Sequence, residues 1–456
     1  MADFLAAQAL LPQGWAADVR IACDDAGTIT EVTRGAPPGA PPGAARRLRG
    51  PVIPGVANLH SHAFQRAMAG GAERRSPAGQ DSFWTWRETM YRFALSITPG
   101  DAEAIAAQLY AECLTRGFTQ VAEFHYLHHA PDGTPYADRA EMAARLFAAA
   151  ESTGIGITML PSLYRHGGIF GAPPHDGQRR FLNDLDGFHT ILERVRGIAA
   201  TQRHASWGVA PHSLRAVTPA MLDAMAALDC PIHIHAAEQE KEVQECLVAT
   251  GLRPLEWLLR NTPLDARWVL IHATHMTPEE TRALAATGAV VGLCPSTEAS
   301  LGDGVFPLPA YLAAEGRLGF GTDSHVGICP AAELRQLEVS QRLALELRSV
   351  ATDEARPHPG RGLLERALSG GAQACGIAMG GIAPGQRCDL VELDDEHPTL
   401  LGRSGDAALD AWCFGPADRM VRSVAVGGRV VVEAGRHLRE GTIREEFART
   451  MKRLGA

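Results

Sequence analysis

The sequence predicts an α/β protein: a (β/α)8 TIM-like barrel with a small β-sandwich domain built from both chain ends. Between residues 51 and 374, eight short apolar runs alternate with amphipathic stretches of helical spacing, a pattern that favours a closed parallel sheet. Strand signals also occur in 1–50 and 375–456, and each of these segments is too short for a core of its own. The 456 residues, 46% of them hydrophobic, are enough to fill both domains.

The two chain ends carry the strand signals of the smaller domain. Apolar residues alternate over 17–21 and 28–32 around a turn at 24–27, which predicts short strands joined by that turn. The Pro/Gly-rich stretch 35–43 is expected to be a loop. Strand signals return at 389–393, 421–426 and 429–433, and the Gly-Gly pair at 427–428 predicts a hairpin between the last two.

The middle of the chain carries the barrel. Its predicted strands are the apolar runs at 52–58, 119–124, 156–160, 207–211, 231–235, 268–272, 289–294 and 319–322. Helices fit between them at 101–116, 139–152, 219–228, 278–286 and 331–347, among others. Active sites of such barrels lie at the carboxyl ends of the strands, so the chemistry is expected at that edge.

Composition narrows the class of partner. Lys and Arg number 43 against 52 Asp and Glu, a net charge of −9 with no basic block, which argues against nucleic acid or an anionic membrane as partner. The nine cysteines are scattered without a C-x-x-C pair, as expected for reduced thiols in the cytoplasm. The first residues lack a basic signal region, and no run of 18 apolar residues occurs, so no membrane span is expected.

A metal site is predicted from side chains at the ends of the proposed strands. His60 and His62 follow the first strand two residues apart, so they point the same way on an extended chain. His235 ends the fifth strand, and Asp323 follows the eighth. Three imidazoles and a carboxylate suit zinc, or another divalent ion such as iron. The alternative is a set of histidines that only satisfy neighbours in the core or at the rim.

Two more polar residues lie at the same edge and complete a candidate catalytic set. Glu238 comes three residues after His235, and His272 ends the sixth strand. Glu238 is a candidate acid/base group. His233, two residues before His235, points the same way but deeper, and we expect it to support the site rather than bind metal.

These motifs resemble the amidohydrolase superfamily, in its mononuclear deaminase branch. The segment Pro54 to His62 looks like the first-strand signature, and 235–238 looks like the fifth-strand H-x-x-E motif. Residues 381–390 resemble the segment where such chains return to the β-sandwich, with Cys388 where alanine is usual. The resemblance implies a metal-dependent hydrolase, and a homodimer.

Lysine scarcity decides between one metal and two. Binuclear members of the superfamily carry a carboxylated lysine at the end of the fourth strand. The chain's two lysines are Lys241 and Lys452, and the predicted fourth strand, 207–211, contains none. One zinc per subunit is therefore expected.

The runs 62–70, 81–92, 123–126 and 212–215 resemble the formimidoylglutamate deiminases, which convert N-formimino-L-glutamate to N-formyl-L-glutamate and ammonia in bacterial histidine breakdown. The resemblance implies that the glutamyl part is held by Arg87, Tyr126, His212 and Arg215, and that Gln65 lies beside it in the substrate site. A substrate with two carboxylates calls for guanidinium groups and hydroxyl donors. The alternatives are a deaminase of the same branch acting on a guanine-, adenosine- or triazine-like ring, and a non-catalytic barrel.

The expected mechanism assigns one role to each catalytic residue. Asp323 accepts a proton from the metal-activated water, Glu238 protonates the leaving nitrogen, and His272 stabilises the tetrahedral intermediate. An aromatic cluster in the loop after the first strand, at 83–91, could line the substrate pocket. We expect instead that it mainly packs this loop onto the barrel.

Overall fold

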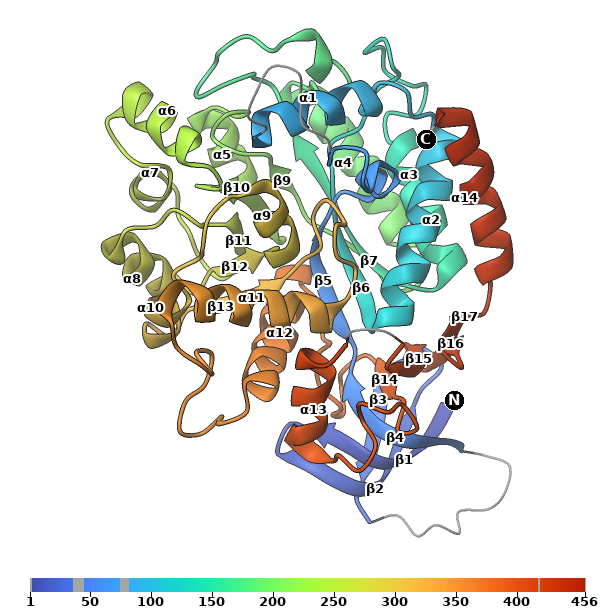
Figure 1. The fold of residues 1–456 in the computed structure, drawn as a ribbon. Coiled ribbons are helices and arrows are strands. Elements are labelled where there is room, and N and C mark those ends of the chain that lie inside the picture. Colours follow the sequence, from blue (N-terminus) through green and yellow to red (C-terminus); the bar gives the residue numbers. More distant parts are fainter. Residues whose placement is uncertain (1, 36–44, 74–81, 417–418, 456) are drawn as a thin grey trace.

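The computed structural model describes residues 2–35, 45–73, 82–416 and 419–455. Figure 1 shows the barrel above a smaller sheet domain in which blue N-terminal strands and red C-terminal strands lie together. The predicted combination of a barrel with a β-sandwich domain from both chain ends is confirmed. Most of the predicted Pro/Gly loop at 35–43 lies outside the described residues.

The barrel wall is parallel throughout. Its strands are β5 (Val56–Ser61), β6 (Phe118–His125), β7 (Gly156–Leu163), β8 (Ala205–Trp207), β9 (Ala210–Pro211), β10 (Ile232–Ala236), β11 (Trp268–His272), β12 (Val290–Leu293) and β13 (Arg317–Phe320). They form one sheet from β5 to β9 and another from β10 to β13. Parallel bridges from Val209 to Ile232 and from Ser61 to Asp323 join the two sheets into a closed wall. The second of these bridges brings the carboxyl ends of the first and last strands together.

Helices surround this wall. They are α2 (Pro99–Arg116), α3 (Glu141–Thr153), α4 (Leu185–Ala199), α5 (Pro219–Ala226), α6 (Glu240–Thr250), α7 (Pro254–Asn261), α8 (Pro278–Ala286), α9 (Pro295–Leu301), α10 (Leu308–Ala313), α11 (Pro330–Leu345) and α12 (Pro359–Cys375). Their ends follow ordinary capping rules. For example, Thr98 and Asp101 form a capping box at the start of α2, and Gly117 ends it at φ 105°.

The smaller domain is built on one eight-stranded sheet, in the order β17-β16-β15-β14-β4-β1-β2-β3. The strands are β1 (Ala2–Leu11), β2 (Gly14–Cys23), β3 (Ile29–Thr33), β4 (Arg46–Pro54), β14 (Leu390–Leu393), β15 (Val421–Val426), β16 (Arg429–Glu433) and β17 (Arg436–His437). β4 pairs with β1 on one side and β14 on the other, so it joins the two chain ends.

Two predicted strands are each divided: 207–211 contains the end of β8 and the whole of β9, and 52–58 contains the end of β4 and the start of β5. The chain leaves the smaller sheet at Pro54 and enters the barrel at Val56. Gly55 makes this transition possible, because a Cβ there would lie 2.2 Å from Oγ1 of Thr119 and 2.8 Å from Cβ of Asp389. Only glycine allows the backbone to approach β6 and β14 this closely.

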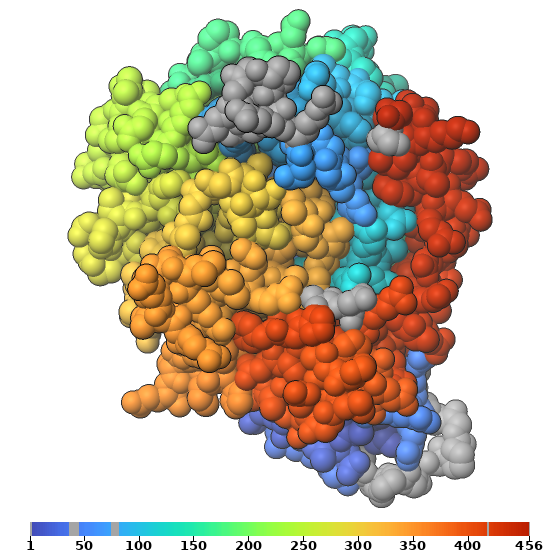
Figure 2. Space-filling model, viewed as in Figure 1, coloured from blue at the N-terminus to red at the C-terminus, as the bar shows by residue number. Residues whose placement is uncertain are grey.

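α1 (Phe83–Ala94), α13 (Gly405–Phe414) and α14 (Glu440–Leu454) lie outside the helical ranges named from the sequence, as do several helices of the barrel. α14, in red, runs beside α2 along the barrel flank (Figure 1; Figure 2). Arg453 near its end bonds to Asp101 of α2. α14 has two fully buried residues, Ile443 and Thr450. Phe447, Met451 and Leu454, which follow Ile443 at helical spacing, pack partly buried against the core. Among the described residues, no helix is both long and apolar enough to cross a bilayer.

Candidate active site

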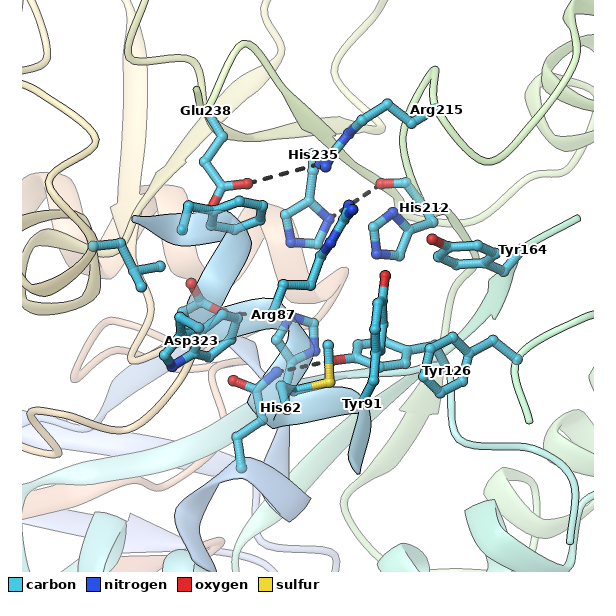
Figure 3. Close-up of a pocket in the computed structure, with 16 residues that line it drawn as sticks. His62, Arg87, Tyr91, Tyr126, Tyr164, His212, Arg215, His235, Glu238 and Asp323 are labelled. Carbon is cyan, nitrogen blue, oxygen red and sulfur yellow. Dashed lines mark hydrogen bonds and ion pairs between the residues drawn. The ribbon is translucent and has the colours of Figure 1, made fainter. Parts of the chain in front are cut away.

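Three histidines meet at the carboxyl edge of the barrel. His60 is in β5, His62 directly follows it, and His235 is in β10. One ring nitrogen from each lies within 4.8 Å of the others, and all three side chains are buried. Oδ1 of Asp323 lies 3.3 Å from Nε2 of His62 and 3.6 Å from Nε2 of His60. Figure 3 shows His62, His235 and Asp323 around the floor of one pocket.

The histidine rings are oriented by backbone carbonyls. Nδ1 of His62 donates to the carbonyl oxygen of Phe124 at 2.8 Å, and Nδ1 of His235 donates to that of His212 at 3.1 Å. Since a carbonyl can only accept, the proton is on Nδ1 and the lone pair of Nε2 is free. Both ring nitrogens of His60 are buried without a hydrogen-bond partner among the described residues. A divalent ion would satisfy these nitrogens, and the donor set fits zinc.

Electrostatics keep these imidazoles neutral. Burial, followed by the charges of neighbouring histidines, lowers the pKa of His60 and of His235 well below the usual value. Burial also lowers the pKa of His62, although Asp323 opposes the shift. Neutral imidazole is the form that binds metal, so the residues are ready for an ion at neutral pH.

The backbone is strained where the barrel strands end. His272 and Ala273 follow one another at φ 69° and 49°, Asp323 has φ 45°, and Ala237 has φ 51°. Left-handed conformations are unfavourable for residues other than glycine and tend to occur at functional sites. Here they turn the chain directly after β10, β11 and β13.

Glu238 and His272 lie beside the histidine cluster. Nε2 of His272 is 3.6 Å from Oε1 of Glu238 and 3.8 Å from Oδ2 of Asp323. Burial raises the pKa of Glu238 to about 7, against the charges of His272 and Arg215. Burial disfavours the charged form of His272, but Glu238, Glu298 and Asp323 together raise its pKa to about 10. A carboxyl group that titrates near neutral pH is suited to moving protons.

Buried glutamates behind the site were missed by the sequence reasoning. Oε1 of Glu298 accepts hydrogen bonds from Nδ1 of His272 at 3.1 Å and from the amide of Cys294 at 2.8 Å. Glu242 accepts from the amides of Ala237 and Glu238, both at 3.3 Å. Both lie in the first turns of helices that follow barrel strands, which is the one signal that could have indicated them.

Two further carboxyl groups were also missed. Glu123, at the end of β6, accepts from Oγ of Ser61 and from the amide of Ala63, both at 2.7 Å, and so holds the two neighbours of His62. Asp303 is buried close to Glu238 and His272. Asp303 bonds to the side chain of Gln239, which belongs to the turn before α6.

All five predicted substrate residues line one pocket together with His62, His235, Glu238 and Asp323: Gln65, Arg87, Tyr126, His212 and Arg215. Nε2 of Gln65 donates to the hydroxyl of Tyr126 at 2.8 Å. Nη2 of Arg215 lies 3.8 Å from Glu238 and 3.9 Å from Glu242. The Nε atoms of Arg87 and Arg215 are buried without a hydrogen-bond partner among the described residues. These two Nε atoms therefore keep hydrogen-bonding capacity for an anion in the pocket.

α1 covers the pocket and carries Arg87. Phe83, Trp86 and Tyr91 of this helix line the cavity. Tyr91 and Trp86 also pack in an apolar cluster of the core, so these aromatic residues both pack the segment and face the pocket. The fourth member, Trp84, stacks on Arg87 at 4.3 Å and on Lys241 of α6 at 4.0 Å. Residue 81 of the motif at 81–92 lies outside the described residues.

His233 supports the barrel rather than the predicted donor cluster. Its Nε2 lies 2.9 Å from the carbonyl of Ala374 in α12. Two further groups could also hold an ion: His272 with Cys294 and Asp323, and Glu238 with His272 and Asp303. Neither group contains three imidazoles, so His60, His62 and His235 form the better zinc site.

Comparison with known proteins agrees with this geometry. The Amidohydrolase family profile matches residues 52–431. The profile of the formimidoylglutamate deiminase HutF N-terminal domain matches residues 3–46. A formimidoylglutamate deiminase from Pseudomonas aeruginosa is 48% identical over 457 aligned positions, covering 100% of both chains.

Solved structures agree as well. An amidohydrolase from Brucella melitensis has a TM-score of 0.94 and 47% identity over 100% of both chains. An atrazine chlorohydrolase from Arthrobacter aurescens TC1, solved with zinc, shares the fold at a TM-score of 0.81 and 21% identity, again over 100% of both chains. The chain belongs to the amidohydrolase family and, within it, to the formimidoylglutamate deiminases.

Proposed function

We propose that the chain hydrolyses N-formimino-L-glutamate to N-formyl-L-glutamate and ammonia, using one zinc ion held by His60, His62, His235 and Asp323. One observation carries the proposal: a single pocket is lined both by histidines of the imidazole cluster and by two guanidinium groups whose Nε atoms have no hydrogen-bond partner among the described residues. The name of the 48% identical relative points to the same reaction.

A divalent ion at the imidazole cluster would supply Lewis-acid activation of water at neutral pH. Asp323, beside Nε2 of His60 and His62, is placed to take a proton from that water. The water oxygen then bonds to the formimino carbon, and a tetrahedral adduct forms. His272, which faces both Glu238 and Asp323, is placed to stabilise this adduct by hydrogen bonding.

Glu238 moves protons to the leaving nitrogen. Its pKa of about 7 lets it give up and regain a proton at little cost in free energy. The bond between the formimino carbon and its terminal nitrogen breaks as that nitrogen is protonated, while the new carbon–oxygen bond becomes a carbonyl. Both protons of the water end on the nitrogen, which leaves as ammonia.

The guanidinium end holds the rest of the substrate. Arg87 and Arg215 are suited to the two carboxylates, because a guanidinium fork binds a carboxylate with two hydrogen bonds. Gln65, Tyr126 and His212 add polar groups to the lining of the same pocket. A substrate fixed at both ends presents its formimino carbon to the activated water in one orientation.

Ammonia release from purified enzyme tests the proposal. N-formimino-L-glutamate should be turned over with a higher kcat/KM than N-formimino-L-aspartate, and guanine should release no ammonia above background. Faster release from guanine would contradict the proposal and favour a ring deaminase. Absence of release from every substrate by zinc-loaded protein would favour a non-catalytic barrel.

A further inference from the structure

A buried glutamine outside the predicted substrate set holds two pocket tyrosines. Gln178 is 1% exposed and ends η2 (Asp176–Gln178), a short helix beyond β7. Its Oε1 accepts a hydrogen bond from the backbone amide of His175 at 3.0 Å. Because a backbone amide can only donate, this bond fixes which end of the side chain is Nε2. That nitrogen donates to the hydroxyl of Tyr164 at 2.6 Å and to the hydroxyl of Tyr91 at 3.4 Å.

This arrangement decides where the hydroxyl protons point. Each tyrosine oxygen accepts from Gln178, so its own proton must be donated elsewhere. At least one O–H is therefore left for the cavity that both rings line. Figure 3 shows the two hydroxyl oxygens pointing to the same region of the pocket, next to His212.

The free hydroxyl lies at the end of the pocket away from the metal donors. The ring of His212 stacks on that of His235 at 4.9 Å between centroids. On its other side His212 meets Tyr164 at 4.6 Å. The ring of His212 therefore lies between Tyr164 and the donor His235. The charges of Arg87 and Arg215 both act on the Tyr164 hydroxyl. Burial raises the pKa of Tyr164 above its usual value, so the hydroxyl keeps its proton and can donate it.

We propose that the Tyr164–Tyr91 hydroxyl pair donates a hydrogen bond to the distal carboxylate of the substrate, and that Gln178 is the positioning residue that makes the pair a donor. This inference rests on the proposed function, and it explains why the site would select a glutamate-derived substrate over the shorter aspartate-derived one. A glutamate side chain brings its carboxylate to the hydroxyl pair, whereas an aspartate side chain is one methylene shorter. The buried side-chain amide of Gln178 thus affects which substrate is bound, without contacting the substrate itself.

Two analogues separate the carboxylates of the substrate. N-formimino-4-aminobutyrate keeps the distal carboxylate and lacks the one next to nitrogen, whereas N-formimino-L-2-aminobutyrate has the reverse. Tyr164→Phe should raise KM for N-formimino-L-glutamate and N-formimino-4-aminobutyrate by roughly 10- to 100-fold, as for a lost hydrogen bond to a charged group. Its kcat should change by less than about threefold, because the bond is equally strong in ground and transition states. Kinetics on N-formimino-L-2-aminobutyrate should stay within about twofold of wild type.

Gln178→Met tests the positioning role, because methionine fills similar space without fixing the hydroxyls. Alone, it should raise the same two KM values, by less than Tyr164→Phe does. Added to a Tyr91→Phe/Tyr164→Phe background, it should have no further effect on KM, since no hydroxyl is left to orient. An equal loss in both backgrounds would show that Gln178 acts only on folding.

Tyr311→Phe is the matched control. Tyr311 is also buried and its hydroxyl bonds to a carbonyl, that of Arg317, but it lies in α10, outside the pocket. This variant should leave every KM unchanged. Equal losses on both analogues, or unchanged KM in Tyr164→Phe, would overturn the inference. Failure of the wild-type enzyme to release ammonia from N-formimino-L-glutamate would instead overturn the proposed function.

Discussion

The two ends of the pocket are built differently. At the imidazole end, His60, His62 and His235 come from barrel strands or the residue after them, and carbonyls or glutamates orient the neighbouring polar groups. At the guanidinium end, Arg87 comes from a helix in a connecting segment, and its Nε has no hydrogen-bond partner among the described residues. The imidazole end is thus arranged for a resident metal ion, whereas the guanidinium end keeps its hydrogen-bonding capacity for a substrate.

The largest effect is expected at the imidazole end. Glu238→Gln keeps the shape and leaves the predicted donors intact, but it cannot transfer protons. We expect zinc content to be unchanged and kcat to fall by roughly 10²- to 10⁴-fold. Metal analysis and steady-state kinetics measure the two quantities. Glu279→Gln, an exposed change on α8, is the control, and near-normal turnover by Glu238→Gln would remove Glu238 from the acid/base role.

A smaller and selective effect is expected at the guanidinium end. Arg215→Met removes a buried charge that would bind a substrate carboxylate, so kcat/KM for N-formimino-L-glutamate should fall by roughly 100-fold. A neutral formamidine should lose far less, because it has no carboxylate to bind. Arg282→Met, an exposed change on α8, controls for loss of charge alone. Equal losses on both substrates would argue against a carboxylate clamp.

The smallest effect concerns the support behind the imidazole end. Glu333 of α11 is buried and bonds to the amide and hydroxyl of Ser296, at the start of α9. Burial raises its pKa to about 7, above the value of about 4.3 expected in an unfolded chain. The folded state therefore binds more protons between these values, and this contribution to stability is lost as pH rises toward 7.

Glu333→Gln removes that titration. Relative to wild type, the variant should be more stable at pH 8 than at pH 5, by roughly 1–3 °C in Tm. Thermal unfolding of the zinc-loaded enzymes at both pH values measures the difference. A difference in Tm that is the same at pH 5 and pH 8 would mean that Glu333 does not titrate in this range.

The contrast between the two ends also explains what could be predicted from the sequence. His60, His62, His235 and Asp323 were predictable because a barrel brings all strand ends to one edge, so positions in the chain translate directly into positions in space. The predicted substrate residues depended on the resemblance to a known family, because no periodicity relates a residue of a connecting segment such as Arg87 to the pocket.

Other features depend on contacts between distant segments. Glu298 and Gln178 carry no motif of their own, and their roles follow from side chains that only the fold brings near them. The break between two strands at Gly55 was missed because the apolar run continues across it. The need for glycine at this position comes from the close approach of Thr119, which the sequence does not show. α14 could have been predicted, because Ile443, Phe447, Met451 and Leu454 recur at helical spacing.

The central claim is that one metal ion binds at the imidazole end. Anomalous diffraction at the zinc edge, from crystals of the zinc-loaded enzyme, tests it most directly. We expect one peak per chain, within about 2.0–2.2 Å of nitrogens of His60, His62 and His235 and an oxygen of Asp323. A peak held instead by His272 and Cys294, or no peak in an active enzyme, would contradict the account.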